Sequence, residues 1–188
     1  YETELNVVSS TTCDEAKMKP DKAEVRLGGV VSKVQVKLDK KGKNFAYVSL
    51  EDLTGTIELL VWSDTFAKAA HVLQPDEVIV VTGQVDAGEK SGQANVKVIA
   101  RDIISLTDAV ESRTETISFK IPRSKVDDET LAFLKQTTES FPGNAATYLK
   151  LADSDGEAIY KLQCSLKPCR ELIEAAQKHL GPRGLELR

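Results

Sequence analysis

Positive charge and aromatic rings gather in one stretch of this sequence, from Lys33 to Tyr47. Five lysines are opposed there only by Asp39, and two aromatic residues complete the set: Lys33, Lys37, Lys40, Lys41, Lys43, Phe45 and Tyr47. Lysine side chains attract phosphate groups, and exposed aromatic rings stack against nucleobases. Together they indicate a surface for single-stranded nucleic acid, whereas a lysine cluster alone would indicate only a solvated hairpin tip.

A strand of alternating polarity has to position the two rings. Between Asn44 and Leu50 small apolar residues occupy every second position, so one face of the strand is buried and the other carries Phe45 and Tyr47. In the turn that follows, Asp52 can accept hydrogen bonds from backbone N–H groups, which is a structural role and not a catalytic one. The rings have an alternative role as well, which is a contact with a neighbouring domain or protein.

The next segment, from Thr56 to Trp62, alternates in the same way. It leaves Glu58 on the outer face, where a carboxylate repels phosphate and weakens binding. Trp62 lies at the junction with a helix, and we expect it to pack there rather than to serve as a platform for bases. On a later strand the alternation turns Lys97 and Arg101 outward, where they either extend the groove or are only solvated. We include Lys97 among the predicted nucleic-acid-binding residues and leave Arg101 open.

The order of elements between residues 23 and 106 is that of an OB-fold, a five-stranded β-barrel with a helix between its third and fourth strands. The expected strands are Val25–Leu38, Asn44–Leu50, Thr56–Trp62, Val78–Val85 and Asn95–Leu106, and the helix begins at Ser63 or Asp64, either of which can cap it. The first strand changes the parity of its apolar positions after Gly28 and Gly29, as a bent barrel strand does. OB-folds bind oligonucleotides on strands 2 and 3 and in loops 1–2 and 4–5, here Asp39–Lys43 and Asp86–Gln93.

A small α+β domain is predicted over residues 115–188, with elements in the order β-α-β-β-α. They are a strand at Thr116–Ile121, a helix capped by Asp127 or Asp128, strands at Ala146–Leu151 and Ala158–Gln163, and a helix with Pro168 at its first position. The apolar stripe of the last helix is expected to be core: Leu172, Ile173, Ala176 and Leu180. Residues 107–114 are predicted to be a polar linker. Residues 1–22 are predicted to connect to a missing upstream domain, because the chain begins at Tyr1 without an initiator methionine.

Composition narrows the possible functions. The net charge is −4, so any nucleic-acid surface has to be local, and no apolar run approaches the roughly 20 residues of a membrane helix. Three cysteines without a CxxC pair and two isolated histidines predict no zinc site, no cofactor, and free thiols in a reducing cytoplasm. Nucleotidyl transfer needs several carboxylates around two metal ions, whereas Asp127–Asp128 and Asp153–Asp155 suit a helix cap and a hairpin turn. We therefore expect no catalytic residue and no metal ligand.

The stretch from Val25 to Trp62 resembles the OB domain of the C-family bacterial replicative polymerases, the DNA polymerase III alpha subunits. That family has a G-x-V first strand, a K-G-K loop, a small-x-V-x-L-E-D-x-T-G turn and an I-E-x-x-V-[FW] strand. The matching positions are Gly29, Lys41–Lys43, Ala46, Val48, Leu50–Asp52, Thr54–Gly55 and Ile57–Glu58. The stretch F-P-G-N…Y-L…D-x-D-G, which begins at Phe141, is similar to the C-terminal domain that follows the OB domain in this family. The resemblance covers nearly the whole chain.

The resemblance implies a non-catalytic part of a DNA-directed DNA polymerase. Its OB domain is expected to guide single-stranded template DNA and its C-terminal domain to dock the tau subunit of the clamp loader. Upstream polymerase domains of the same chain are expected as further partners, and a membrane is not. Two alternatives remain open. One is an anticodon-binding OB domain of a class II aminoacyl-tRNA synthetase, which shares the E-D-x-x-G turn, and the other is a barrel that binds only protein.

Overall fold

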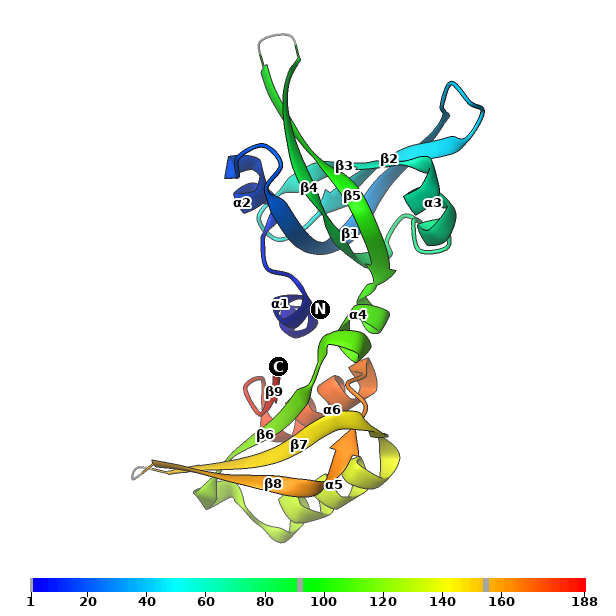
Figure 1. The fold of residues 1–188 in the computed structure, drawn as a ribbon. Coiled ribbons are helices and arrows are strands. Elements are labelled where there is room, and N and C mark those ends of the chain that lie inside the picture. Colours follow the sequence, from blue (N-terminus) through cyan, green and yellow to red (C-terminus); the bar gives the residue numbers. More distant parts are fainter. Residues whose placement is uncertain (1, 91–92, 154–155) are drawn as a thin grey trace. The chain divides into compact units, whose positions relative to one another are not determined.

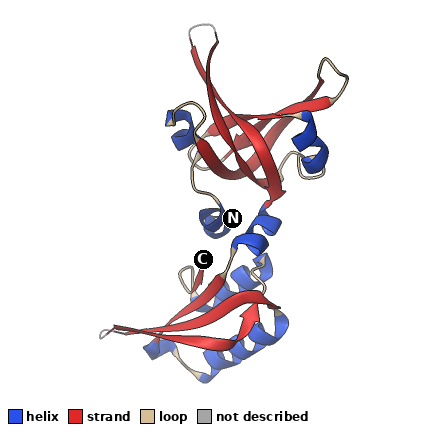
Figure 2. Ribbon diagram, in the orientation of Figure 1, coloured by secondary structure: helices blue, strands red, loops and turns tan. Residues whose placement is uncertain are grey.

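The computed structural model describes residues 2–90, 93–153 and 156–188, and it divides into two compact units between Ala109 and Val110. Figure 1 follows the chain through both units, and Figure 2 shows their helices and strands. In the part of the chain that the structure describes, no helix is both long and apolar enough to cross a membrane.

The first unit is built on a closed β-barrel of the OB type. Its strands are β1 (Glu24–Leu38), β2 (Asn44–Glu51), β3 (Thr56–Val61), β4 (Val78–Lys90) and β5 (Gln93–Ser105), and helix α3 (Ser63–Ala69) follows β3. The strands are hydrogen-bonded in the order β1-β2-β3-β5-β4, and β1 and β4 close the barrel (Figure 1). In the described part of this barrel, β3 and β5 pair in parallel and the other neighbouring strands pair antiparallel. The predicted five-stranded barrel with one helix between its third and fourth strands is confirmed.

Strand β1 serves two sides of this barrel. Its first half pairs with β4 and its second half with β2, and the register against β2 shifts between Val31 and Lys33. This shift is the predicted change of parity, because it turns Lys33 and Lys37 outward on the face that β2 shares. The bend brings Gly29 so close to β2 that a Cβ atom there would lie 2.5 Å from the carbonyl oxygen of Glu51.

Several boundaries differ from the sequence prediction. Strand β4 continues to Lys90 and β5 begins at Gln93, so most of the expected loop Asp86–Gln93 is paired strand; residues 91–92 lie outside the described residues. Trp62 occupies the N-cap position of α3 and no side chain caps this helix, so capping by Ser63 or Asp64 is wrong.

Residues 107–114, which were predicted to be a polar linker, are mostly helical. They belong to α4 (Leu106–Arg113), which begins where the Ser105 hydroxyl accepts a hydrogen bond from the backbone N–H of Asp108 at 3.0 Å. A serine followed three residues later by an acidic residue is a helix-start signal. Ala109 and Val110 are buried.

Two short helices pack against the barrel where the sequence suggested a connector: α1 (Glu2–Val8) and α2 (Cys13–Met18). Cys13 and Ala16 of α2 are fully buried in the barrel core. The backbone N–H of Cys13 donates to Asp52 Oδ2 at 2.7 Å, and the other oxygen of Asp52 accepts the N–H of Thr54 at 2.8 Å and of Gly55 at 3.0 Å. Asp52 therefore joins the β2–β3 turn to α2, which confirms its predicted structural role.

Removal of the Asp52 carboxylate is expected to destabilise the first unit. Burial raises the pKa of Asp52, but the hydrogen bonds from Thr54, Cys13 and Gly55 lower it by more, so the carboxyl stays charged well below neutral pH. Asp52→Ala leaves the partly buried N–H groups of Cys13 and Gly55 without their acceptor and should cost roughly 1–3 kcal/mol of unfolding free energy. Urea unfolding followed by the fluorescence of Trp62, the only tryptophan, reports this unit. Glu51→Gln, the exposed neighbour, should unfold like wild type; equal stability of Asp52→Ala would contradict the assignment.

The second unit is a four-stranded sheet with two α-helices. Its elements are β6 (Thr116–Pro122), a 3-10 turn (Arg123–Lys125), α5 (Asp128–Ser140), β7 (Pro142–Asp153), β8 (Gly156–Leu166), α6 (Arg170–Leu180) and β9 (Leu185–Leu187). The sheet order is β8-β7-β6-β9, with β6 and β7 parallel. This unit has the predicted α+β class and one strand more than predicted, because three residues are too few for an alternation to be recognised. Residues 154–155 of the predicted β7–β8 turn lie outside the described residues.

The helices of the second unit confirm most of the expected signals. Asp127 caps α5 by accepting the N–H of Thr130 at 2.8 Å. Of the predicted core residues of α6, Leu172, Ile173 and Ala176 are buried, whereas Leu180 is only half-buried. Cys169 holds the N-cap position of α6, so Pro168 lies before the helix and not at its first position.

Glu186 of β9 makes the second unit sensitive to acid. Its carboxylate contacts Lys150 at 2.8 Å, Lys120 at 2.9 Å and Arg188 at 2.6 Å, and the hydrogen bond from Lys150 contributes most to lowering its pKa from 4.5 to about 2. A depressed carboxyl pKa stabilises the fold above the unfolded-state value and ceases to do so as the pH falls through the folded-state value.

Glu186→Gln should therefore lower the stability of the second unit by roughly 1–3 kcal/mol at pH 7. The difference from wild type should shrink as the pH falls from 4.5 toward 2. Urea unfolding by circular dichroism, compared with the Trp62 signal of the first unit, checks this. Glu139→Gln on the exposed side of α5 is the matched control. A difference that stays constant with pH would contradict the role given to Glu186.

Candidate nucleic-acid interface

Three aromatic rings form a row on the outer face of the barrel. Ala46, Val48 and Leu50 of β2 are buried, and Phe45 and Tyr47 between them point outward and are half-buried. The ring centroids of Phe45 and Tyr47 lie 5.7 Å apart with the planes at 67°. Trp62 extends the row, because its ring lies 5.7 Å from that of Phe45 at an interplanar angle of 30°.

For Trp62 the sequence predicted packing at the helix junction rather than stacking of bases. It does pack against Phe45, but 49% of its surface stays exposed. The alternation that places Glu58 and Leu60 on the outer face of β3 continues to Trp62, and this signal was present in the sequence. Trp62 thus presents the most exposed ring of the row.

Two lysines surround the ring of Tyr47. The ammonium of Lys37 lies 4.8 Å from the ring centroid and that of Lys97 lies 4.9 Å from it, distances typical of cation–π contacts. Lys97 also pairs with Glu58 at 2.9 Å, and only 16% of its side chain is exposed. The hydrogen bond to Glu58 raises the pKa of Lys97. Lys97 is therefore held in place beneath Tyr47, and Glu58 is neutralised by it.

The β1–β2 loop, Asp39–Lys43, is closed around one carboxylate. Asp39 Oδ1 accepts the backbone N–H of Lys41 at 2.8 Å and of Lys43 at 2.9 Å, and Gly42 takes a positive φ of 74°. The Asp39 N–H donates to the Lys43 carbonyl at 2.8 Å. With its backbone fixed in this way, the loop projects Lys40, Lys41 and Lys43 into solvent. We refer to residues Asp39–Lys43 as the lysine loop.

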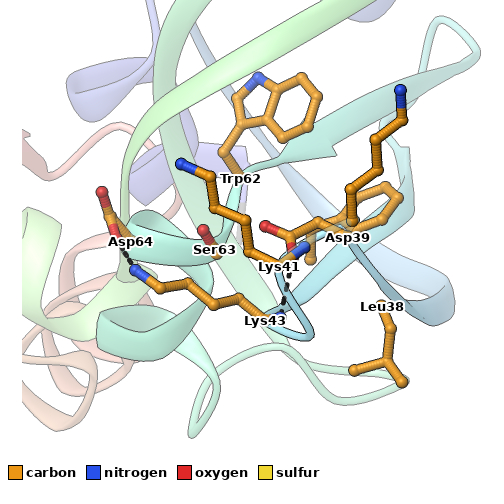
Figure 3. Close-up of a pocket in the computed structure, with 9 residues that line it drawn as sticks. Leu38, Asp39, Lys41, Lys43, Trp62, Ser63 and Asp64 are labelled. Atoms are coloured by element: carbon orange, nitrogen blue, oxygen red, sulfur yellow. Dashed lines mark hydrogen bonds and ion pairs between the residues drawn. The ribbon is translucent and has the colours of Figure 1, made fainter.

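An open groove of about 580 Å³ lies between the lysine loop and the start of α3. Cationic, aromatic and acidic side chains line most of it, together with Leu38 and Ser63. The full lining is Leu38, Asp39, Lys40, Lys41, Lys43, Phe45, Trp62, Ser63 and Asp64. Figure 3 shows Lys43 reaching from the loop toward Asp64, with their side chains 3.8 Å apart.

The predicted site residues thus lie on one face, although not all are equally available. Lys37 pairs in register with Phe45, Gln35 with Tyr47 and Lys33 with Ser49, so Lys33 lies on the same face but farthest from the loop. Arg101, which the sequence left open, is bound to Glu24 at 2.9 Å.

The groups considered for other chemistry are engaged elsewhere. Asp127 caps a helix and Asp153 pairs with Arg123 at 3.0 Å. Among the described residues no cluster of three or more His, Cys, Asp or Glu side chains could hold a metal ion. Cys13, Cys164 and Cys169 are free thiols, and burial raises the pKa of Cys13 to about 12.

The barrel, its helix position and this outer face define the first unit as an OB-fold. Residues 25–106 match the family model described as an OB-fold nucleic acid binding domain.

Relatives with similarity beyond the barrel are named DNA polymerase III subunit alpha. The protein of Pseudomonas aeruginosa is 26% identical over 166 residues, which are 87% of this chain and 14% of that protein. That of Mycobacterium tuberculosis is 27% identical over 166 residues, again 87% of this chain and 14% of that protein. That of Neisseria meningitidis serogroup B is 31% identical over 121 residues, 64% of this chain and 10% of that protein. This chain therefore spans about one seventh or less of the length of these three relatives.

Among solved structures, the hypothetical protein ygiW from E. coli is 21% identical, with a TM-score of 0.40 over 52% of this chain and 89% of that one.

Proposed function

We propose that this chain acts as a non-catalytic part of a bacterial replicative DNA polymerase alpha subunit, and that its OB-fold guides single-stranded template DNA. The observation that supports this most directly is the row of Tyr47, Phe45 and Trp62 beside the lysine loop. Aromatic platforms next to a positively charged groove hold single strands without reading their sequence. The similarity to DNA polymerase III alpha subunits favours DNA as the strand.

The affinity is expected to be modest and strongly dependent on salt. The chain has a net charge of −4, so the lysine loop attracts phosphate against an overall negative field. Each phosphate contact releases condensed counterions from the strand, so the binding constant falls as the salt concentration rises. A surface of this kind suits a strand that has to move across it.

Titration of a labelled oligonucleotide at several salt concentrations tests the proposal. Oligothymidylate is expected to bind at low salt, with an affinity that falls linearly in a plot of log K against log salt concentration. Oligouridylate and a tRNA anticodon stem-loop serve as competitors. A clear preference for the stem-loop would favour an anticodon-binding function, and no binding at low salt would favour a barrel that binds only protein.

For the second unit, we infer a docking role toward the clamp-loader tau subunit. The similarity to the alpha subunits continues through this unit, since it reaches 92% of the chain in one Neisseria meningitidis relative. Strand β8 lies at an edge of the sheet, and its residues Ile159 and Tyr160 are 57% and 51% exposed. An edge strand with exposed apolar side chains is the kind of surface that a protein partner covers.

A pull-down with a purified bacterial tau subunit tests the docking role. The intact chain should retain tau, and Ile159→Ser with Tyr160→Ser should weaken the retention. Lys135→Ala on α5 provides an unrelated surface change as the control. Failure of the intact chain to retain tau leaves the docking role unsupported, while the oligonucleotide titration decides the role of the OB-fold separately.

A further inference from the structure

Two lysines of the binding face are paired with carboxylates, and the two pairs differ in kind. Lys97 and Glu58 lie 2.9 Å apart, and Lys97 is largely covered beneath Tyr47. Lys43 and Asp64 lie 3.8 Å apart, and their side chains are 62% and 91% exposed. The Lys97–Glu58 pair therefore supports the ring of Tyr47 from below. The second pair is loose, lies in the groove and is open to exchange with another anion.

We propose that Asp64 competes with a DNA phosphate for Lys43 and thereby limits how tightly the strand is held. This inference rests on the proposed function of the OB-fold. In the free protein the Asp64 carboxylate occupies the place that a phosphate takes in the complex. Binding exchanges one anion for the other at the same ammonium group.

The position of Asp64 makes the competition persistent. It follows Trp62 by two residues at the start of α3, so the helix backbone keeps its carboxylate in the groove after a phosphate has displaced it (Figure 3). The displaced carboxylate then faces the bound phosphate across a short distance, and like charges repel. Asp64 therefore opposes binding twice, by occupying Lys43 beforehand and by repelling the phosphate afterwards.

The other carboxylate of the groove has a different function. Asp39 accepts two backbone N–H groups of the lysine loop, and its removal would disturb the loop itself. Among the described residues, the Asp64 carboxylate forms its ion pair with Lys43. Asp64 can therefore be neutralised without loss of a structural hydrogen bond, which makes it the informative position.

Asp64→Asn is expected to bind oligothymidylate roughly two- to fivefold more tightly than wild type at low salt, since exposed ion pairs are weak. The matched control is Glu51→Gln, which also removes one negative charge. Glu51 ends β2, whereas the lysine loop precedes its first residue, Asn44, so the control lies roughly 24 Å along the strand from the loop. It should change the affinity much less.

A double-mutant cycle with Lys43→Ala tests whether Asp64 acts through Lys43. In the Lys43→Ala background, the gain from Asp64→Asn should be clearly smaller than in the wild-type background, because the competition for Lys43 is absent and only the repulsion of the phosphate remains. If wild type binds DNA and Asp64→Asn behaves like Glu51→Gln, or if the full gain persists without Lys43, the inference is overturned and the proposed function stands. If wild type shows no salt-dependent binding, the proposed function is overturned and the inference with it.

Discussion

Replacement of Lys40, Lys41 and Lys43 by alanine is expected to weaken oligothymidylate binding roughly 10- to 100-fold at low salt. Each phosphate contact on a single strand contributes about 0.7 to the slope of log K against log salt concentration. Loss of three contacts should therefore flatten that slope by about 2. Fluorescence anisotropy of a labelled oligonucleotide over a salt series measures both quantities. The effect should be large because Asp39 already fixes the backbone of the lysine loop, so the loop loses little conformational entropy when it binds DNA.

The control has to separate a local contact from a change in net charge. Lys125→Ala, Lys135→Ala and Lys178→Ala together remove the same three charges from exposed positions outside the loop. The slope of log K against log salt concentration for this triple variant should differ from the wild-type slope by no more than about 0.7, which is the contribution of one phosphate contact. If both triple variants lose the same affinity, the lysine loop has no special role and the protein responds only to total charge.

Trp62→Ala is expected to lower the affinity for a single strand by roughly 1–3 kcal/mol, which is about 5- to 150-fold. The reason is that Trp62 has the most exposed ring of the aromatic row and lies in the groove beside the lysine loop. Tyr47 is half-buried and already has the ammonium groups of Lys37 and Lys97 against its ring, so a base has to compete with them. Tyr47→Phe, which keeps that ring, should bind nearly as wild type does.

The intrinsic fluorescence of the chain gives an independent measurement of this prediction. Trp62 is the only tryptophan, so stacking of a base on it should quench the signal of the wild-type protein directly. Trp62→Phe should restore most of the affinity, and circular dichroism should show that Trp62→Ala keeps its fold. If Trp62→Ala binds with the affinity of wild type, bases do not stack on Trp62. Stacking then takes place on Phe45 or does not contribute to binding.

Much of the barrel could be predicted from the pattern of side chains. The alternation in β2 separates Ala46 and Val48 from Phe45 and Tyr47, because successive residues of a strand point to opposite faces. The change of parity in β1 predicts its bend for the same reason. The extra length of β4 and β5 was missed, since their polar residues resemble a loop when no buried face requires apolar side chains.

The sequence by itself determined which side of each strand carries the rings and lysines, because the period of a strand is a local property of the chain. Only the tertiary structure decided how those groups meet. Closure of the barrel brings Lys97 of β5 beneath Tyr47 of β2, and the path from β3 into α3 places Trp62 against Phe45 and Asp64 against Lys43. Such contacts join residues distant in sequence, and their distances depend on the strand order and register of the whole barrel. For that reason the lysine and aromatic residues were recognisable in advance, but the extent to which each ring is exposed and the approach of Asp64 to Lys43 were not.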